Sequence, residues 1–238
     1  GVNGMRVKVQ CGITGRVKEV YNLGGANAFL FQNQHLEDLK HMVCPSEALH
    51  TSIAIRREQI EGFIKEMKHH LPSSFHDDMI VNFQTEGASA VNAAVDLLMQ
   101  IRGTGKVAVG SRSYHGPQNS SFGSGATNMA QQIIFPLALP SLRLGYETNS
   151  QFEARMRKMI TDWFQRHGDS VAVLLLEPVG GTQLQAYTQP MSILHHIFSL
   201  AKSYDIAVVC DEVFVAFRSS QESFVSISQG LLPDAITF

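Results

Sequence analysis

The chain has 238 residues, of which 44% are hydrophobic and 17% charged, enough to bury the core of one large domain or two small ones. Its formal net charge of −2 lacks the basic character of proteins that bind nucleic acid or anionic membrane surfaces. No apolar run reaches the roughly 18 residues of a membrane-spanning helix, and Cys11, Cys44 and Cys210 have no CxxC spacing. We therefore expect a soluble cytoplasmic protein without a nucleic-acid or membrane partner.

From about residue 50 onward, segments with helical periodicity alternate with short apolar segments. The expected helices cover about residues 60–71, 88–101, 152–164 and a stretch opened by Pro190. The expected strands cover residues 79–83, 107–109, 132–136, 171–176 and 206–210, with a last strand within 232–238. Ile101 is expected on the apolar face of its helix, and Gly168 is expected as a C-cap glycine. The alternation predicts an α/β fold, with a mainly parallel sheet and helical crossovers.

The periodicity also suggests a division of the chain. Residues 1–50 are less periodic and are expected to form an N-terminal arm or part of a small domain, whereas residues 51–238 are expected to form one large domain. The last strand stops in mid-run at Phe238. We therefore expect the large domain to be incomplete at this end, with a C-terminal small domain absent from the chain.

The most informative segment is the apolar run at residues 206–210, which is closed by Asp211 and Glu212. In open α/β sheets, ligands bind outside the carboxyl ends of the strands, which is where Asp211 falls. A carboxylate at a buried strand end is costly without a partner, so Asp211 is expected to face a cation. The ring nitrogen of a cofactor is one candidate.

Three other segments follow predicted strands. Residues 84–90 form a small-residue turn into a helix, whose free amides would suit a phosphate, although most such turns bind nothing. Tyr114 could lie against a planar ligand or could be an ordinary half-buried tyrosine, and His115 beside it could be structural. Glu177 closes a strand before Pro178, and its simplest role is to pair with an arginine.

The order of these motifs is more specific than any one of them. They are Glu86-Gly87-Ala88-Ser89, Tyr114-His115-Gly116, Glu177-Pro178, Asp211-Glu212-Val213 and the Pro233-Asp234 segment that ends at Phe238. Together they resemble the class-III aminotransferases, pyridoxal-phosphate (PLP) enzymes of fold type I. The spacing from Asp211 to Phe217 and Arg218 is most similar to the glutamate-semialdehyde aminomutase branch.

The resemblance implies a PLP cofactor and a role for each matching residue. Backbone amides of Gly87 and Ala88, with Ser89 beside them, would hold the phosphate. Tyr114 and Val213 would cover the two faces of the ring, and Asp211 would pair with its nitrogen. His115 and Glu177 would belong to the same pocket. The family's Schiff-base lysine would follow Phe238 by two positions, and the site would lie at a homodimer interface.

Three residues depart from the family pattern. Glu86 stands where a hydroxyl residue is usual beside the phosphate, Ser89 stands where a Glu is usual, and Ala216 replaces a Gly. The expected function is transamination of an amino acid or amine through a carbanion that the protonated ring stabilises. One alternative is a different reaction with the same cofactor: aminomutation, epimerisation, decarboxylation, substitution or carbon–carbon bond formation. Another is a catalytically dead binding or assembly subunit.

Two arginines are candidates for holding a substrate carboxylate, because the planar guanidinium matches both oxygens. Arg112 precedes Tyr114 by two positions and Arg218 follows Asp211 by seven; each could instead be a surface residue or a partner of Glu177 or Glu212. No metal site is expected, because the histidine pairs at 69–70 and 195–196 lack metal-ligand spacing.

Overall fold

The computed structural model describes residues 2–3, 6–10, 17–21, 57–77, 79–84, 86–103, 105–116, 132–180, 187–217 and 223–238. The chain divides into two compact units, Gly1–Phe63 and Ile64–Phe238. The first contains an antiparallel sheet of β1 (Val2–Asn3), β2 (Arg6–Gln10) and β3 (Val17–Tyr21). Helix α2 (Arg57–His69) runs across the boundary. The proposed division at residue 50 stays a prediction.

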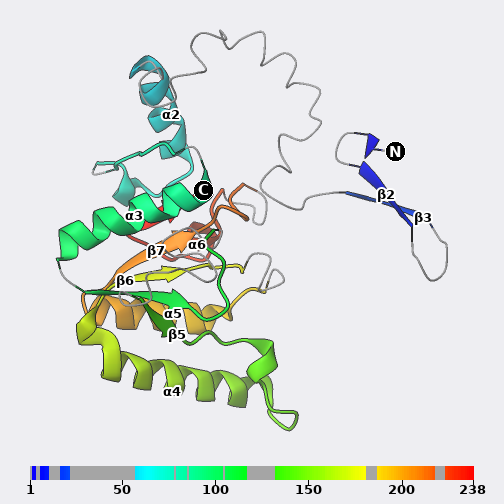
Figure 1. Ribbon diagram of the computed structural model, residues 1–238, viewed down its shortest axis with the longest axis vertical. Coiled ribbons are helices and arrows are strands. Elements are labelled where there is room, and N and C mark those ends of the chain that lie inside the picture. Colours follow the sequence, from blue (N-terminus) through cyan, green and yellow to red (C-terminus); the bar gives the residue numbers. More distant parts are fainter. Residues whose placement is uncertain are drawn as a thin grey trace. The chain divides into compact units, whose positions relative to one another are not determined.

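The second unit is built on a five-stranded sheet in which every neighbouring pair is parallel (Figure 1). Its order is β5-β4-β6-β7-β8. The strands are β4 (Lys106–Gly110), β5 (Gln132–Phe135), β6 (Val171–Leu176), β7 (Ala207–Asp211) and β8 (Ala235–Thr237). The prediction of a mainly parallel α/β sheet is confirmed.

The predicted strand at residues 79–83 is wrong. Residues 79–84 have no regular secondary structure, and Ile80 and Phe83 are exposed. A strand is held by the ladder of hydrogen bonds to its neighbour, and no described strand pairs with this segment. The apolar content of the segment predicted a strand without identifying a partner for it.

Helices cover both faces of the sheet, as Figure 1 shows, with α3 on one side and α4 and α5 on the other. Besides the end of α2, the described residues of this unit form α3 (Gly87–Arg102), α4 (Asn149–His167), α5 (Met191–Ser203) and α6 (Val225–Ser228), with 3₁₀ turns at Ser73–Phe75, Pro140–Leu142 and Gly168–Ser170. The predicted helices are thus confirmed, with ends that differ by a few residues.

Alternate residues of each central strand enter two different cores. Val173 and Leu175 of β6 pack with α3, whereas Leu174 and Leu176 pack in the core with α4 and α5. This follows from the two-residue period of a strand, and it explains why the central strands are continuously apolar. Ile101 of α3 is 66% exposed and lies outside both cores, contrary to the prediction, because it falls in the last turn of the helix.

Gly168 ends α4, as predicted, but not for the predicted reason. A C-cap glycine commonly adopts a left-handed conformation; Gly168 is right-handed, with φ −52° and ψ −45°. A Cβ atom at this position would lie 2.4 Å from the ring of Tyr204, so close packing of the ring requires the glycine. The sequence predicts where the helix ends, and the contact with Tyr204 explains why the residue there is a glycine.

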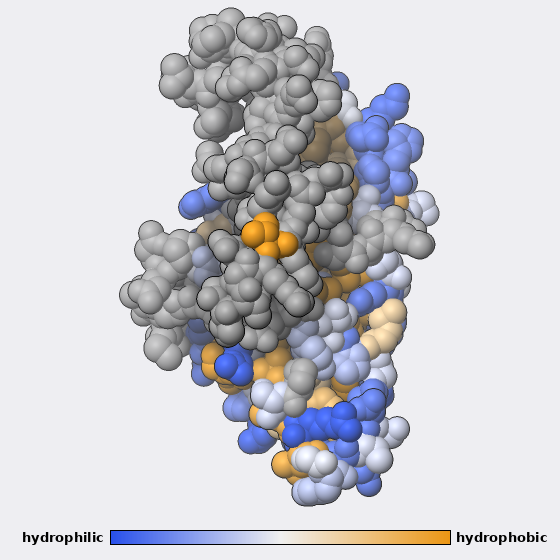
Figure 2. Space-filling view, turned by 90° about the vertical axis from the view of Figure 1, so that its right-hand side faces the viewer, coloured by the Kyte–Doolittle hydropathy of each residue, from blue (hydrophilic) through white to orange (hydrophobic). Residues whose placement is uncertain are grey.

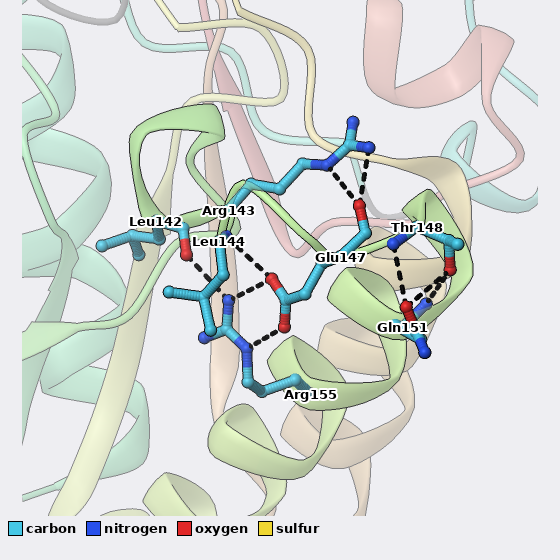
Figure 3. Close-up of polar contacts among 7 residues, drawn as sticks. All are labelled: Leu142, Arg143, Leu144, Glu147, Thr148, Gln151 and Arg155. Atoms are coloured by element: carbon cyan, nitrogen blue, oxygen red, sulfur yellow. Dashed lines mark hydrogen bonds and ion pairs between the residues drawn. The ribbon is translucent and has the colours of Figure 1, made fainter.

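The start of α4 is fixed by a polar cluster (Figure 3). Thr148 and Gln151 form a capping box, in which each side chain bonds the backbone N–H of the other. The Glu147 carboxylate is buried, accepts hydrogen bonds from Arg155 Nε at 2.6 Å and Nη2 at 2.8 Å, and accepts another from the Leu144 amide. The Arg155 hydrogen bond, more than any other cause, lowers the pKa of Glu147 to about 2.

The order of the sheet places a candidate site. Strand β5 follows β4 in the chain and lies on one side of it, while β6 lies on the other, so the direction of winding reverses at β4. Ligands in such sheets bind outside the carboxyl ends of the strands, at this reversal.

On the face shown in Figure 2, hydrophilic residues predominate at the lower end of the view. None of the helices in the described part of the chain is long and apolar enough to span a membrane.

Candidate active site

Asp211 is the last residue of β7, and its side chain is only 6% exposed. Its Oδ2 lies 2.7 Å from Nδ1 of His115, and its Oδ1 accepts a 3.1 Å hydrogen bond from the amide of Val213. No lysine or arginine in the described ranges forms an ion pair with it; the described pairing is with the His115 imidazole. A buried carboxylate held by an imidazole and an amide is positioned for a further cationic partner.

The turn after β4 brings Tyr114 and His115 to this edge of the sheet. The backbone amide of Tyr114 donates a 2.9 Å hydrogen bond to Oε2 of Glu177, which is buried at the end of β6. The Tyr114 ring is half-buried and meets Phe214 edge to face, with the ring centroids 6.2 Å apart. Glu177 therefore anchors the turn that carries Tyr114, and His115 orients Asp211.

The first turn of α3 meets the loop after β7. A Cβ atom on Gly87 would lie 2.7 Å from Cγ1 of Val213, so only glycine allows this approach. The amides of Gly87, Ala88 and Ser89 are in the first helical turn, where backbone donors lack helical acceptors. Glu86 occupies the N-cap position and makes no side-chain capping bond to them. These donors can receive an anion.

The two residues that flank Asp211, Cys210 in β7 and Glu212 just after it, have structural roles. The Glu212 carboxylate is fully buried and accepts hydrogen bonds from the amides of Val225 and Ser226, at 2.6 and 2.9 Å, and from the Ser226 hydroxyl. Burial raises the pKa of Glu212, while these hydrogen bonds oppose the shift. Cys210 is a free, buried cysteine, and burial raises the pKa of its thiol well above its ordinary value, which disfavours the reactive thiolate.

The structure describes only one of the two predicted substrate arginines. Arg112 is exposed, in the turn before Tyr114, and has a left-handed backbone with φ 63°. Arg218 lies outside the described residues. In the described ranges, no group of three or more His, Cys, Asp or Glu side chains is arranged to hold a metal ion.

Two polar residues at this end of the sheet, Thr237 and Ser113, were not among the predicted site residues. Thr237 is paired with Asp211 in the β7–β8 register, and its hydroxyl lies 3.4 Å from Asp211 Oδ1. Ser113 is buried beside Tyr114, and its hydroxyl has no hydrogen-bond partner within the described part of the chain. Only the strand order brings Thr237 to Asp211, so no local pattern could have identified Thr237. Ser113 lies in the turn after β4, and that position could have identified it from the sequence.

A family model with the description aminotransferase class III matches residues 36–238, most of the chain. The chain belongs to this family. Class-III aminotransferases are PLP-dependent, so the resemblance inferred from the ordered motifs is confirmed, along with the cofactor of the family. Of the motifs that led to it, three lie at or after the carboxyl ends of β4, β6 and β7, and one lies at the start of α3. The fifth, Pro233-Asp234, precedes β8.

Similar proteins of this class include enzymes with different named reactions. A glutamate-1-semialdehyde 2,1-aminomutase of Haloquadratum walsbyi is 28% identical over 160 residues, which cover 67% of this chain and 34% of that protein. An adenosylmethionine-8-amino-7-oxononanoate aminotransferase of Staphylococcus aureus is 25% identical over 134 residues, covering 52% of this chain and 29% of the relative. The chain thus spans about a third of the length of these relatives.

Solved structures show the fold. An omega-aminotransferase from Paracoccus denitrificans has a TM-score of 0.73 at 19% identity, over 98% of this chain and 55% of that one. The PMP-bound aminotransferase from Vibrio fluvialis has a TM-score of 0.71 at 21% identity, over 89% of this chain and 51% of that one. The predicted fold-type-I architecture of the class-III family is therefore confirmed, and the chain covers part of it.

The residues of this class-III chain fit PLP in two respects. Asp211 is a buried carboxylate whose described partners are His115 and neutral donors, which suits a protonated ring nitrogen. The first turn of α3 is held against the same loop through Gly87 and Val213, which suits a phosphate on the backbone amides. The two features lie near each other because Val213 is two residues from Asp211.

Proposed function

We propose that this chain is the cofactor-binding part of a PLP-dependent enzyme that transfers an amino group from an amino acid or amine. The observation that carries the proposal is the buried Asp211, oriented by His115 at the carboxyl edge of the sheet and close to the first turn of α3. The family match supports it, whereas the cofactor geometry itself is part of the proposal.

Each site residue has a distinct task in this proposal. Asp211 would keep the ring nitrogen protonated, and His115 would hold the carboxylate in place through Nδ1. Gly87, Ala88 and Ser89 would bind the phosphate; Tyr114 and Val213 would enclose the ring, and Glu177 would fix the Tyr114 turn. When bound, PLP supplies an electron sink for the carbanion at the substrate's α-carbon.

The substrate is proposed to be a small amino acid or amine. At least one of Arg112 and Arg218 would hold its carboxylate or order the cofactor pocket, because guanidinium pairs with both carboxylate oxygens. The exposed position of Arg112 beside Tyr114 is compatible with this role. Replacing each with alanine and measuring kcat and KM tests it; unchanged kinetics in both variants contradict it.

Aminomutation is the second candidate, favoured by the similarity to glutamate-1-semialdehyde aminomutases. Both reactions would use the same cofactor as their electron sink, so the cofactor contacts do not separate them. Product analysis does: transamination gives a carbonyl product and a new amine from two substrates, whereas aminomutation rearranges one substrate. The other PLP reactions, and a catalytically dead assembly subunit, are tested by the same assay.

We also propose a cytoplasmic homodimer, with residues 51–238 as the cofactor-binding domain and residues 1–50 as an arm or part of a small domain. The unpaired, buried thiol of Cys210 supports a reducing compartment. The family resemblance supports the dimer, whose partner would help to hold the phosphate. Sedimentation of the full-length protein tests this state, and an active monomer contradicts it.

The central experiment is cofactor binding by the full-length protein. Purified protein is mixed with PLP, reduced with borohydride and mapped by peptide mass. We expect a visible absorbance band from bound cofactor and a modified lysine two positions after Phe238. A protein that takes up no PLP contradicts the proposal, and PLP binding without a modified lysine supports the dead subunit instead.

A further inference from the structure

Two departures from the family motif, Glu86 and Ser89, are in contact. The Ser89 hydroxyl donates a 3.2 Å hydrogen bond to Oε1 of Glu86. Glu86 is the N-cap of α3 and Ser89 is the third residue of the helix. In a capping box the hydroxyl residue is at the N-cap and the acid is three residues later; here the two residue types are exchanged. The departures therefore form one unit.

The exchange leaves a negative charge at the start of α3. Glu86 is exposed, and its side chain makes no capping hydrogen bond to the first-turn amides. No lysine, arginine or histidine in the described ranges forms an ion pair with it. Ser89 is neutral, so its hydrogen bond orients the carboxylate without cancelling the charge. An anion on the amides of Gly87 and Ala88 would meet this charge.

We propose that Glu86 lowers the affinity of this protein for the phosphate group of its cofactor, and that Ser89 holds the Glu86 carboxylate where it does so. The inference rests on the proposed PLP function and adds a determinant of cofactor retention. The physical basis is repulsion between a carboxylate and a phosphate of charge near −2. The repulsion opposes the favourable amide donors and helix dipole. Salt screens it, because Glu86 is exposed.

The test separates the phosphate from the rest of the cofactor. Pyridoxamine 5′-phosphate and pyridoxamine differ only in that group, and neither forms a covalent bond to a lysine. Their dissociation constants are measured on the full-length protein by calorimetry, for wild type and Glu86→Gln. We expect the variant to bind pyridoxamine phosphate about three- to tenfold more tightly at low ionic strength. Pyridoxamine affinity should not change, and the gain should shrink in salt.

Asp96→Asn is the matched control. Asp96 is an exposed acid on the same helix, ten residues from Glu86 and so about 15 Å along the axis. Its replacement changes net charge equally and should leave both affinities unchanged. The effect of Glu86→Gln should also be smaller in a Ser89→Ala background, because the carboxylate is no longer held. An equal effect in that background overturns the role of Ser89.

The outcomes separate the inference from the proposed function. If neither ligand binds to any variant, the PLP function fails. If pyridoxamine phosphate binds, but Glu86→Gln binds it as wild type does, the inference alone is overturned. An equal gain for pyridoxamine, or for Asp96→Asn, overturns it as well, because the effect would not then depend on the phosphate or on position.

Discussion

Two buried carboxylates in this chain have very different partners. Glu147, at the start of α4, is paired with Arg155, whose two nitrogens contact both carboxylate oxygens (Figure 3). Asp211, at the end of β7, is paired with His115 and with the neutral donors Val213 and Thr237. Arg155 therefore compensates the charge of Glu147 within the fold, whereas no lysine or arginine among the described residues pairs with Asp211.

The difference separates a structural acid from a candidate functional one. A carboxylate with an arginine partner has its charge compensated within the fold, as the lowered pKa of Glu147 records. A carboxylate held mainly by an imidazole and neutral groups is oriented, yet its charge is left available for a ligand cation. Burial alone does not distinguish the two, because both side chains are less than 10% exposed.

The largest expected effect is that of Asp211→Asn. This change keeps the shape of the side chain and removes the charge that would hold the ring nitrogen protonated, so kcat should fall at least about a hundredfold. Circular dichroism should show an intact fold. Glu147→Gln is the matched control and should leave kcat nearly unchanged. Near-wild-type turnover in Asp211→Asn would show that the charge of Asp211 has no role in catalysis.

The next effect concerns His115 as a positioning residue. His115→Leu removes a hydrogen bond to a charged group, which contributes about 1.5–3 kcal/mol, so kcat should fall roughly ten- to hundredfold. KM for the amino substrate should change much less than kcat, because the proposed role of His115 is to hold Asp211 through Nδ1. His115→Gln retains an N–H donor and should recover part of the activity. Equal losses in the two variants would show that the hydrogen bond is not the cause.

A smaller effect is expected at the start of α3. Gly87→Ala places a methyl group 2.7 Å from Val213, which should weaken cofactor binding about tenfold and lower the free energy of unfolding by about 1–3 kcal/mol. Gly62→Ala is the control, because a Cβ atom added at Gly62 in helix α2 would have nothing within 4 Å. That change should raise the free energy of unfolding by up to about 1 kcal/mol. Equal effects at both glycines would contradict the close contact.

The smallest effect belongs to Glu147→Gln, and it is one of stability. The pKa of Glu147 in the folded protein, about 2, lies below the ordinary glutamate pKa of 4.5, so ionised Glu147 stabilises the fold above pH 4.5. That contribution is lost as the pH falls from 4.5 toward 2. Thermal unfolding should therefore show the variant less stable at neutral pH, with the difference shrinking across this range. A difference independent of pH would show that the carboxylate charge is not responsible.

The sequence was sufficient to predict the five strands of the parallel sheet, but not the antiparallel sheet of β1, β2 and β3. The apolar runs at β6 and β7 predicted strands buried on both faces, because each alternate residue meets a separate core. The ordered motifs at Gly87, Tyr114, Glu177 and Asp211 predicted the family, which the family model confirmed. Residues 79–83 were wrongly predicted as a strand, because a pattern of apolar residues does not supply the neighbouring strand that a ladder needs.

What the sequence by itself determined is the type and position of most elements and the residue types at the strand ends, since periodicity and turn residues act locally. Only the tertiary structure decided the strand order, which places Thr237 opposite Asp211 and Glu177 against the Tyr114 amide. It also decided that Gly87 packs on Val213 and Gly168 on Tyr204. These contacts join residues far apart in the chain, and their geometry is fixed by packing rather than by local pattern.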